Sequence, residues 1–177
     1  TKTKDLLNIK PEQAIKHPNW SMGKKISVDS ATMMNKGLEL IEAHFLFEMP
    51  YKKIDVIIHP ESIIHSCVEY TDGSILSQMG TPDMRIPISF VLAYPDRISN
   101  SVKKLELGKV KELTFFEPDL DKFPCLELAY ESLKIKKSAP TILNAANEVA
   151  VDAFLSNRIK YLSIPKLVEK TLNKASF

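Results

Sequence analysis

The sequence lacks most of the features that would assign it to a specialised class of protein. Its two cysteines, Cys67 and Cys125, are far apart and have no CxxC spacing. A disulfide framework or a cysteine zinc site is therefore not expected, and a reducing compartment is favoured. No apolar run reaches the roughly 18 to 20 residues that a membrane span needs. A net charge of +2 is too small to indicate a nucleic-acid partner.

The amino end also lacks a start residue and a targeting signal. Thr1–Lys10 does not begin with Met and does not resemble a signal peptide, so secretion is not expected. The segment reads like the interior of a longer chain, and we expect a fragment. No GxGxxG dinucleotide-binding turn and no HExxH zinc motif occur.

What is present is the composition of an ordinary folded protein. The chain has 177 residues, 44% apolar and 26% charged, which suffices for one medium domain or two small ones. We predict an α+β fold in three zones. Residues 1–98 form a first segment with strands and helices, residues 99–122 form a linker, and residues 123–177 form a helical domain.

The last zone shows repeated helix starts. Pro124, Pro140 and Pro165 each open a stretch with helical apolar spacing, and Pro is tolerated in the first turn of a helix. Ser138 and Ser163 lie where a side chain could cap a helix. We expect a bundle of about three helices, incomplete at its carboxyl end.

One stripe in this zone predicts how the bundle packs. Leu143, Ala146, Ala150 and Phe154 recur at helical spacing. Ala145 and Ala146 are small enough to let a neighbouring helix approach closely.

The first zone contains a predicted β-hairpin. Residues 62–70 and 74–79 are β-type runs separated by Thr71-Asp72-Gly73, and Asp-Gly favours a hairpin turn. We predict a further strand over residues 55–58. Strand 62–70 is apolar on both faces, with Ile64, Val68 and Tyr70 on one side and Ile63 and Cys67 on the other. Both faces of such a strand should be covered, either by helices or by a second subunit.

The most informative stretch is Lys24–Phe47. A short β-type run, Ile26–Val28, is expected to lead into a helix that ends near Phe47. On a helical wheel one narrow arc forms the predicted core face, which consists of Met34, Leu38, Ile41 and Phe45.

A second arc of this helix carries polar groups. Asn35, Lys36 and Glu39 converge on one turn, and Ser30 lies near the expected helix start, where free N–H groups favour an anion. These groups make a phosphate site. The alternative is an ordinary surface pair of Lys36 with Glu39, worth a few tenths of a kcal/mol. The apolar residues that follow predict a buried helix, which favours function.

Several other residues have two readings. The segment from His17 to Gly23 is a candidate lid, although Trp20 could pack in a core and His17 could be a structural hydrogen-bonding residue. His59 and His65 lack metal-ligand spacing, and a histidine in a strand is more often a core residue than a ligand. Residues 80–85 read as a turn and a helix start.

Four segments, read together, resemble the 1-deoxy-D-xylulose 5-phosphate reductoisomerase family. They are HPNWSMGKKISVDSATMMNKGLELIEA, HPESIIHS, GTPDMRIPI and LNAANE, and the resemblance covers nearly the whole chain from Pro11. It implies rearrangement of a phosphorylated ketose on Mg or Mn, and then reduction by NADPH to 2-C-methyl-D-erythritol 4-phosphate in non-mevalonate isoprenoid biosynthesis.

The resemblance also implies roles for single residues. Glu39 is the metal ligand and, with Lys36 and His17, is implied to be catalytic. Substrate binding falls to Ser30, Asn35, Lys36, His17, Trp20 and Met22, with the last two and His17 on the closing loop. Pro82 and Met84 lie against the nicotinamide, and the role of His65 stays open.

The family's NADPH-binding domain and its other metal ligands are missing from the sequence. We therefore expect the chain to be the carboxyl-terminal part of the enzyme, with residues 1–98 as part of its catalytic or dimerisation domain. Alone, the chain is expected to be inactive and unable to hold the metal tightly. A homodimer is also implied, with no nucleic-acid or membrane partner. The family works in bacterial cytoplasm and in plastid-type organelles. The rival hypothesis is a non-catalytic dimerisation or ligand-binding fragment.

Overall fold

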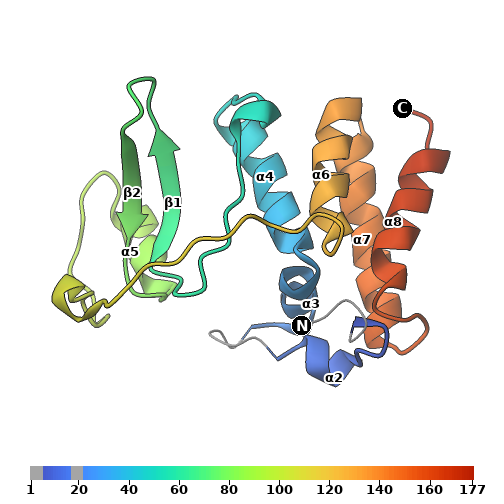
Figure 1. Cartoon of the computed structure of the whole chain (residues 1–177), viewed down its shortest axis with the longest axis horizontal. Coiled ribbons are helices and arrows are strands. Elements are labelled where there is room, and N and C mark those ends of the chain that lie inside the picture. Colours follow the sequence, from blue (N-terminus) through green and yellow to red (C-terminus); the bar gives the residue numbers. More distant parts are fainter. Residues whose placement is uncertain (1–5, 17–21) are drawn as a thin grey trace. The chain divides into compact units, whose positions relative to one another are not determined.

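A computed structural model of the chain describes residues 6–16 and 22–177, and its fold is of the α+β class (Figure 1). The helices are α2 (Pro11–Ala14), α3 (Lys24–Thr32), α4 (Met34–Leu46), α5 (Arg85–Ala93), α6 (Pro124–Ile135), α7 (Ala139–Leu155) and α8 (Ser163–Lys174). Short 3-10 turns cover Tyr51–Lys53 and Leu107–Lys109, and the strands are β1 (Ile64–Glu69) and β2 (Ile75–Met79). Within the described ranges no helix is long and apolar enough to cross a membrane.

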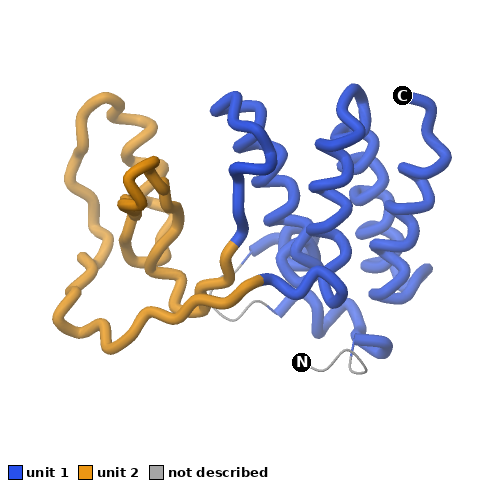
Figure 2. The backbone as a smooth tube through the Cα atoms, turned by 45° about the horizontal axis from the view of Figure 1, so that its top comes forward, with its two compact units in different colours: residues 1–56, 118–177 blue, residues 57–117 orange. Residues whose placement is uncertain are grey.

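The chain divides into two compact units, shown in Figure 2. Unit 1 comprises residues 1–56 and 118–177, and unit 2 comprises residues 57–117. This division differs from the predicted zones, because the first part of the chain contributes helices to the unit that also holds α6, α7 and α8. The predicted domain boundaries at 98 and 122 stay a prediction.

Unit 1 is a helical bundle around one apolar core. α6, α7 and α8 pack on one another as predicted, while α4 packs against α6 and α3 against α7 (Figure 1). The predicted stripe on α7 is buried, with Leu143, Ala150 and Phe154 at most 1% exposed. Of the two small residues expected to admit a neighbour, Ala146 is buried and Ala145 is exposed. A partner helix for the bundle thus comes from α4, far upstream in the sequence.

The helix starts follow the prolines more closely than the serines. Pro124 and Pro140 lie in the first two positions of α6 and α7. Ser138 occupies the cap position of α7 but its side chain makes no capping hydrogen bond. Ser163 is itself the first residue of α8. The predicted capping by these two hydroxyls is wrong.

The stretch Lys24–Phe47 is two helices rather than a strand followed by one helix. Ile26–Val28 lies inside α3, so the predicted β-type run is wrong. Burial of Val28 and its neighbours in the bundle outweighs the weak β preference of branched side chains. Met33, in the left-handed region with φ 59°, separates α3 from α4.

The core face of α4 differs from the predicted arc. Met34 is fully buried, and Leu38 and Ile41 are half-buried and pack against the core as predicted. Leu40, which was not in the predicted arc, is also in the core at 2% exposed. Phe45 is 61% exposed, so its assignment to the core is wrong. Gly37 completes the face, since a Cβ there would come within 2.8 Å of the Ala129 Cβ on α6.

Unit 2 contains the predicted hairpin. β1 and β2 are antiparallel and turn through Asp72 and Gly73, whose φ of 84° suits glycine. The predicted strand over residues 55–58 is wrong, because only an isolated bridge between Ile58 and Phe116 forms there.

A register shift in β1 changes which side chains share a face. Ile64 pairs with Met79 and Ser66 pairs with Gln78, so one residue between them is extra. Met79 and Gln78 are adjacent in β2 and point to opposite faces. Ile64 therefore lies on the face opposite Ser66 and Val68, contrary to the simple alternation predicted.

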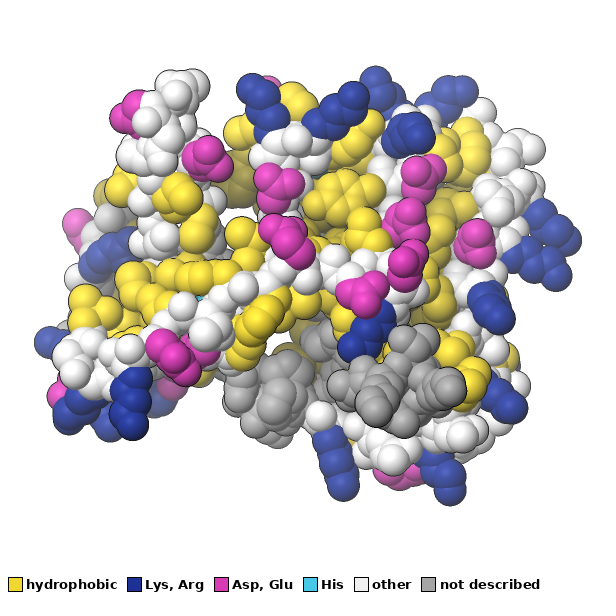
Figure 3. Space-filling model, in the orientation of Figure 1, with side chains coloured by type: hydrophobic (Ala, Val, Ile, Leu, Met, Phe, Trp, Pro, Cys, Tyr) yellow, Lys and Arg dark blue, Asp and Glu magenta, His cyan; other side chains and the backbone are white. Residues whose placement is uncertain are grey.

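The strands are also uncovered within the described part of the chain. Residues 65–69 and all of β2 are exposed. Apolar side chains reach the surface in the region of this hairpin (Figure 3). Val68, Ile75 and Leu76 are each more than half exposed. The predicted cover on both faces is not supplied by the described residues of this chain.

Candidate functional site

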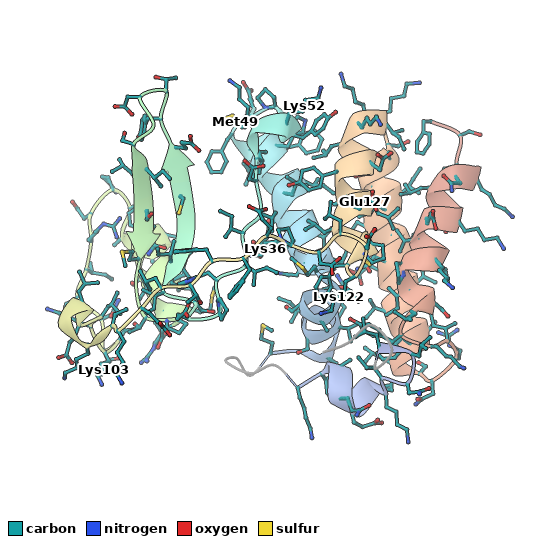
Figure 4. The ribbon with its side chains drawn as sticks, in the orientation of Figure 1. Lys36, Met49, Lys52, Lys103, Lys122 and Glu127 are labelled. Carbon is teal, nitrogen blue, oxygen red and sulfur yellow. The ribbon has the colours of Figure 1, made fainter. Side chains whose placement is uncertain are left out.

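The predicted polar cluster forms on the first turns of α4. The Asn35 amide donates to one oxygen of Glu39 at 2.7 Å, and the Lys36 ammonium contacts the other oxygen at 2.6 Å. Lys36 projects from α4 in Figure 4. Spacings of three and four residues place all three side chains on one side of a helix, as the sequence predicts. An amide, an ammonium and a carboxylate therefore meet at one place.

The cluster is open rather than buried. The side chains of Lys36 and Glu39 are 46% and 47% exposed, and Leu46 and Phe47 beyond them are also exposed. The predicted burial of this helix is wrong for its outer face and its carboxyl end. An exposed pair of this kind contributes at most about 1 kcal/mol to stability. Its charges are thus accessible to a ligand.

Ser30 lies close to this cluster along the chain but not where the sequence prediction put it. It sits in the last turn of α3 and is half-buried, so the predicted position at a helix start is wrong. The residues on either side of it are anchored. The Ala31 carbonyl accepts a 2.6 Å hydrogen bond from the Tyr161 hydroxyl, and the buried Asp29 carboxylate bonds to α7.

Asp29 is the centre of a polar network that the sequence analysis did not identify. Its Oδ1 accepts from the Asn147 amide at 2.9 Å, and its Oδ2 lies 2.8 Å from the Lys25 ammonium. Lys25 also pairs with Glu148 at 2.6 Å. Partial burial alone would lower the pKa of Lys25, but its bonds to Asp29 and Glu148 outweigh this and raise it. The LNAANE segment, which includes Asn147 and Glu148, was the available sequence signal.

The predicted lid is described only at its end. His17 and Trp20 lie outside the described residues. Met22 is half-buried and precedes Gly23, the residue at the cap position of α3. Its role as a lid residue stays a prediction.

The other predicted site residues belong to unit 2. His65 is exposed and is the extra residue at the register shift of β1, a kind of irregularity that redirects a side chain. Pro82 and Met84 are exposed just before α5. Asp83 lies between them and accepts hydrogen bonds from the Arg85 side chain and backbone amide, which lower the pKa of Asp83 to about 2.

The described residues can be tested as ligands of the divalent metal that the resemblance implies. Glu39 offers carboxylate oxygens, which hard cations prefer, and each oxygen keeps a lone pair beyond its present hydrogen bond. Across residues 6–16 and 22–177, no group of three His, Cys, Asp or Glu side chains could hold a metal ion. Glu39 is therefore one candidate ligand, and the described residues form no complete metal site.

Comparison with protein families gives two matches. Residues 79–177 match the family described as DXP reductoisomerase C-terminal domain. Residues 1–47 match the family described as 1-deoxy-D-xylulose 5-phosphate reductoisomerase C-terminal domain.

Similar proteins and structures carry the same description. The 1-deoxy-D-xylulose 5-phosphate reductoisomerase of Clostridium perfringens (strain SM101) is 58% identical to this chain; the match covers 96% of this chain and 44% of that protein. The enzyme of the same name from Acetivibrio thermocellus is 56% identical; the match covers 99% of this chain and 46% of that protein. A Zymomonas mobilis structure of that enzyme with NADPH is 49% identical and has a TM-score of 0.92. The match covers the whole of this chain and 45% of the chain in that structure. A structure described as DOX-P reductoisomerase with NADPH, fosmidomycin and magnesium is 51% identical over 98% of this chain and 43% of its own, with a TM-score of 0.95. The chain thus spans less than half the length of these relatives.

Proposed function

Because the chain belongs to the DXP reductoisomerase C-terminal domain family, we propose that it acts within a longer polypeptide that converts 1-deoxy-D-xylulose 5-phosphate into 2-C-methyl-D-erythritol 4-phosphate. That enzyme uses NADPH and Mg or Mn. The observation that carries the proposal is the meeting of Asn35, Lys36 and Glu39 on one open turn. It joins groups suited to phosphate with a group suited to a divalent metal.

The charges of this cluster suit an exchange of partners on ligand binding. In this structure the Lys36 ammonium and the Asn35 amide both bond to the Glu39 carboxylate. Glu39 would hold the metal, and Lys36 and Asn35 would then donate to phosphate oxygens together with the Ser30 hydroxyl. Each charged group then keeps a partner of opposite sign, so neither is left unpaired in the closed site.

The remaining site residues orient the substrate and exclude water. The metal, when bound, polarises the substrate carbonyl and fixes adjacent oxygens. The loop that carries His17, Trp20 and Met22 closes over the bound phosphoketose, and His17 contributes to catalysis from that loop. Closure keeps water from the rearranging carbons. Pro82 and Met84 lie against the nicotinamide, where exposed apolar groups suit a flat ring.

Unit 2 supports the proposal that the enzyme is a homodimer. Val68 and Leu76 form a cross-strand pair on one face of the hairpin, and they are 57% and 64% exposed. Exposed apolar strand faces of this kind mark interaction surfaces. A second copy of the chain would cover them.

The rival function is a non-catalytic dimerisation or ligand-binding fragment, which the same hairpin would serve. It is less favoured, because the relatives that match 96% and 99% of this chain are reductoisomerases. The bacterial relatives favour bacterial cytoplasm over a plastid-type organelle as the place of action.

The test is NADPH oxidation driven by 1-deoxy-D-xylulose 5-phosphate in the full-length enzyme. Oxidation that requires both the phosphoketose and Mg or Mn is expected. Absence of turnover in a folded full-length enzyme, with both cofactors present, would contradict the proposal and favour the non-catalytic fragment.

A further inference from the structure

We propose that Asn147 and Tyr161 are positioning residues for Ser30, because they hold the turn of α3 that carries it against the helical bundle. The inference rests on the proposed function, in which Ser30 binds the substrate phosphate. It assigns a task to the LNAANE segment of α7 and to the loop before α8, neither of which is in the proposed site.

The first anchor is made one residue before Ser30. Asp29 is 1% exposed and Asn147 is fully buried. The Asn147 amide donates to Oδ1 of Asp29 at 2.9 Å, while Lys25 satisfies Oδ2. A buried carboxylate is tolerated only where its oxygens are paired. The pairing therefore selects one placement of α3 on α7.

The second anchor is made one residue after Ser30. The last carbonyls of a helix have no partner within it, and Ala31 lies in the last turn of α3. The Tyr161 hydroxyl donates to the Ala31 carbonyl at 2.6 Å. Tyr161 is 5% exposed and lies edge-on to Phe154, with ring centroids 5.7 Å apart. Burial raises the pKa of the Tyr161 phenol, which keeps it protonated as a donor.

A third contact between α3 and α7 is weaker. Lys25 bridges Asp29 and Glu148, but Glu148 is half exposed, so that pair contributes little on its own. The two buried bonds on either side of Ser30 are the anchors that matter.

The break at Met33 explains why anchoring is needed. Ser30 lies on α3, whereas Asn35 and Lys36 lie on α4, and Met33 interrupts the helix between them. α3 and α4 contact each other beside this break, and each also packs on the bundle, α3 on α7 and α4 on α6. Their relative placement therefore depends on the bundle contacts as well as on the break itself. A phosphate held by all three groups requires positions accurate to about 0.5 Å.

The test is a double-mutant cycle in the full-length enzyme. Tyr161→Phe and Asn147→Ala are each made alone and together with Ser30→Ala. Each single anchor variant should raise KM for the phosphoketose about tenfold, the scale of one hydrogen bond, and leave KM for NADPH within about twofold. In the Ser30→Ala background the additional loss should vanish, because the anchors act through Ser30.

Ser132→Ala is the matched control. Its hydroxyl is also fully buried in the bundle, but it bonds to Ala129 of its own helix and not to α3. It should lower the unfolding temperature without changing KM for the phosphoketose.

The outcomes that overturn the inference are distinct from failure of the proposed function. If the rise in KM of each anchor variant is the same in the Ser30→Ala background as in the parent, the anchors do not act through Ser30. An unchanged KM in Tyr161→Phe would likewise show that the anchors are merely structural. Tyr161→Phe removes a single oxygen and decides the question if Asn147→Ala does not fold. An active enzyme in which Ser30→Ala has no effect would remove Ser30 from the site and the inference with it, while leaving the reductoisomerase activity standing.

Discussion

At the scale of single residues, spacing along a helix was enough to predict the polar cluster. Asn35, Lys36 and Glu39 meet because residues three and four apart share a helix face, whatever the helix packs against. Their exposure could not be predicted in the same way, since it depends on which residues cover α4. Asp29 and Asn147, 118 positions apart, meet only through the tertiary fold, so their bond has no local sequence pattern.

Glu39→Gln in the full-length enzyme tests the proposed metal ligand. Removing the carboxylate charge should reduce turnover by about 10²-fold or more, because several kcal/mol of metal-dependent stabilisation are lost. The unfolding temperature should stay close to that of the parent, since the cluster is exposed. Glu42→Gln, the same change one turn further along α4 at another exposed position, is the control and should keep the parent rate. Normal turnover in Glu39→Gln would remove Glu39 from the site.

Glu61 gives a prediction about pH. Hydrogen bonds from Thr114, at 2.6 Å from its hydroxyl and 3.1 Å from its amide, lower the pKa of Glu61, with a smaller contribution from His59. A carboxyl group whose pKa is lowered by folding stabilises the fold at pH values above its ordinary pKa of 4.5. This stabilisation is lost as the pH falls through the lowered pKa.

Thr114→Val removes the hydroxyl donor and keeps the shape of the side chain. In a carboxyl-detected NMR titration of the chain, the midpoint of Glu61 should rise toward 4.5 in this variant. Equal midpoints in parent and variant would mean that Thr114 does not set the pKa of Glu61.

At the scale of elements, local signals predicted most of the architecture. The hairpin follows from Asp72-Gly73, and the starts of α6 and α7 follow from their prolines. The misses have tertiary causes. Ile26–Val28 is helical because the bundle buries Ser27 and Val28. The break at Met33 uses a left-handed conformation that is uncommon for methionine, so the sequence does not predict it.

Gly37→Ala tests the close packing of α4 on α6. The added Cβ would lie 2.8 Å from the Cβ of Ala129, which is fixed to the backbone and cannot turn away. Overpacking costs about 1 to 3 kcal/mol, and the better helix propensity of Ala returns up to about 1 kcal/mol. The unfolding temperature should therefore fall. Gly108→Ala, where no atom lies within 4 Å of the added Cβ, is the control and should change stability by less than about 0.5 kcal/mol. An unchanged unfolding temperature in Gly37→Ala would contradict the close packing.

At the scale of the whole molecule, the two units differ in how far they cover their apolar side chains. Unit 1 has a large apolar core, whereas the hairpin of unit 2 leaves apolar side chains uncovered in the described part of the chain. Of the residues proposed for the site, the α4 cluster belongs to unit 1 and Met84 belongs to unit 2.

Val68→Glu in the full-length enzyme tests the proposed dimer surface. A buried, unpaired charge there should weaken association at least about tenfold, measured as the monomer fraction by sedimentation velocity. Val149→Glu, at a similarly exposed valine on α7, is the matched control and should leave the dimer intact. If both variants raise the monomer fraction equally, or if neither raises it, the Val68 face is not the interface.

We propose that this chain supplies the phosphate contacts and one metal ligand to a site that the rest of the enzyme completes. Calorimetric titration with Mn of the 177-residue chain, the full-length enzyme and its Glu39→Gln variant tests this proposal. We expect weak binding to the chain alone, tight one-to-one binding to the full-length enzyme, and loss of that binding in the variant. Tight one-to-one binding to the chain alone would contradict it, as would binding that does not depend on Glu39.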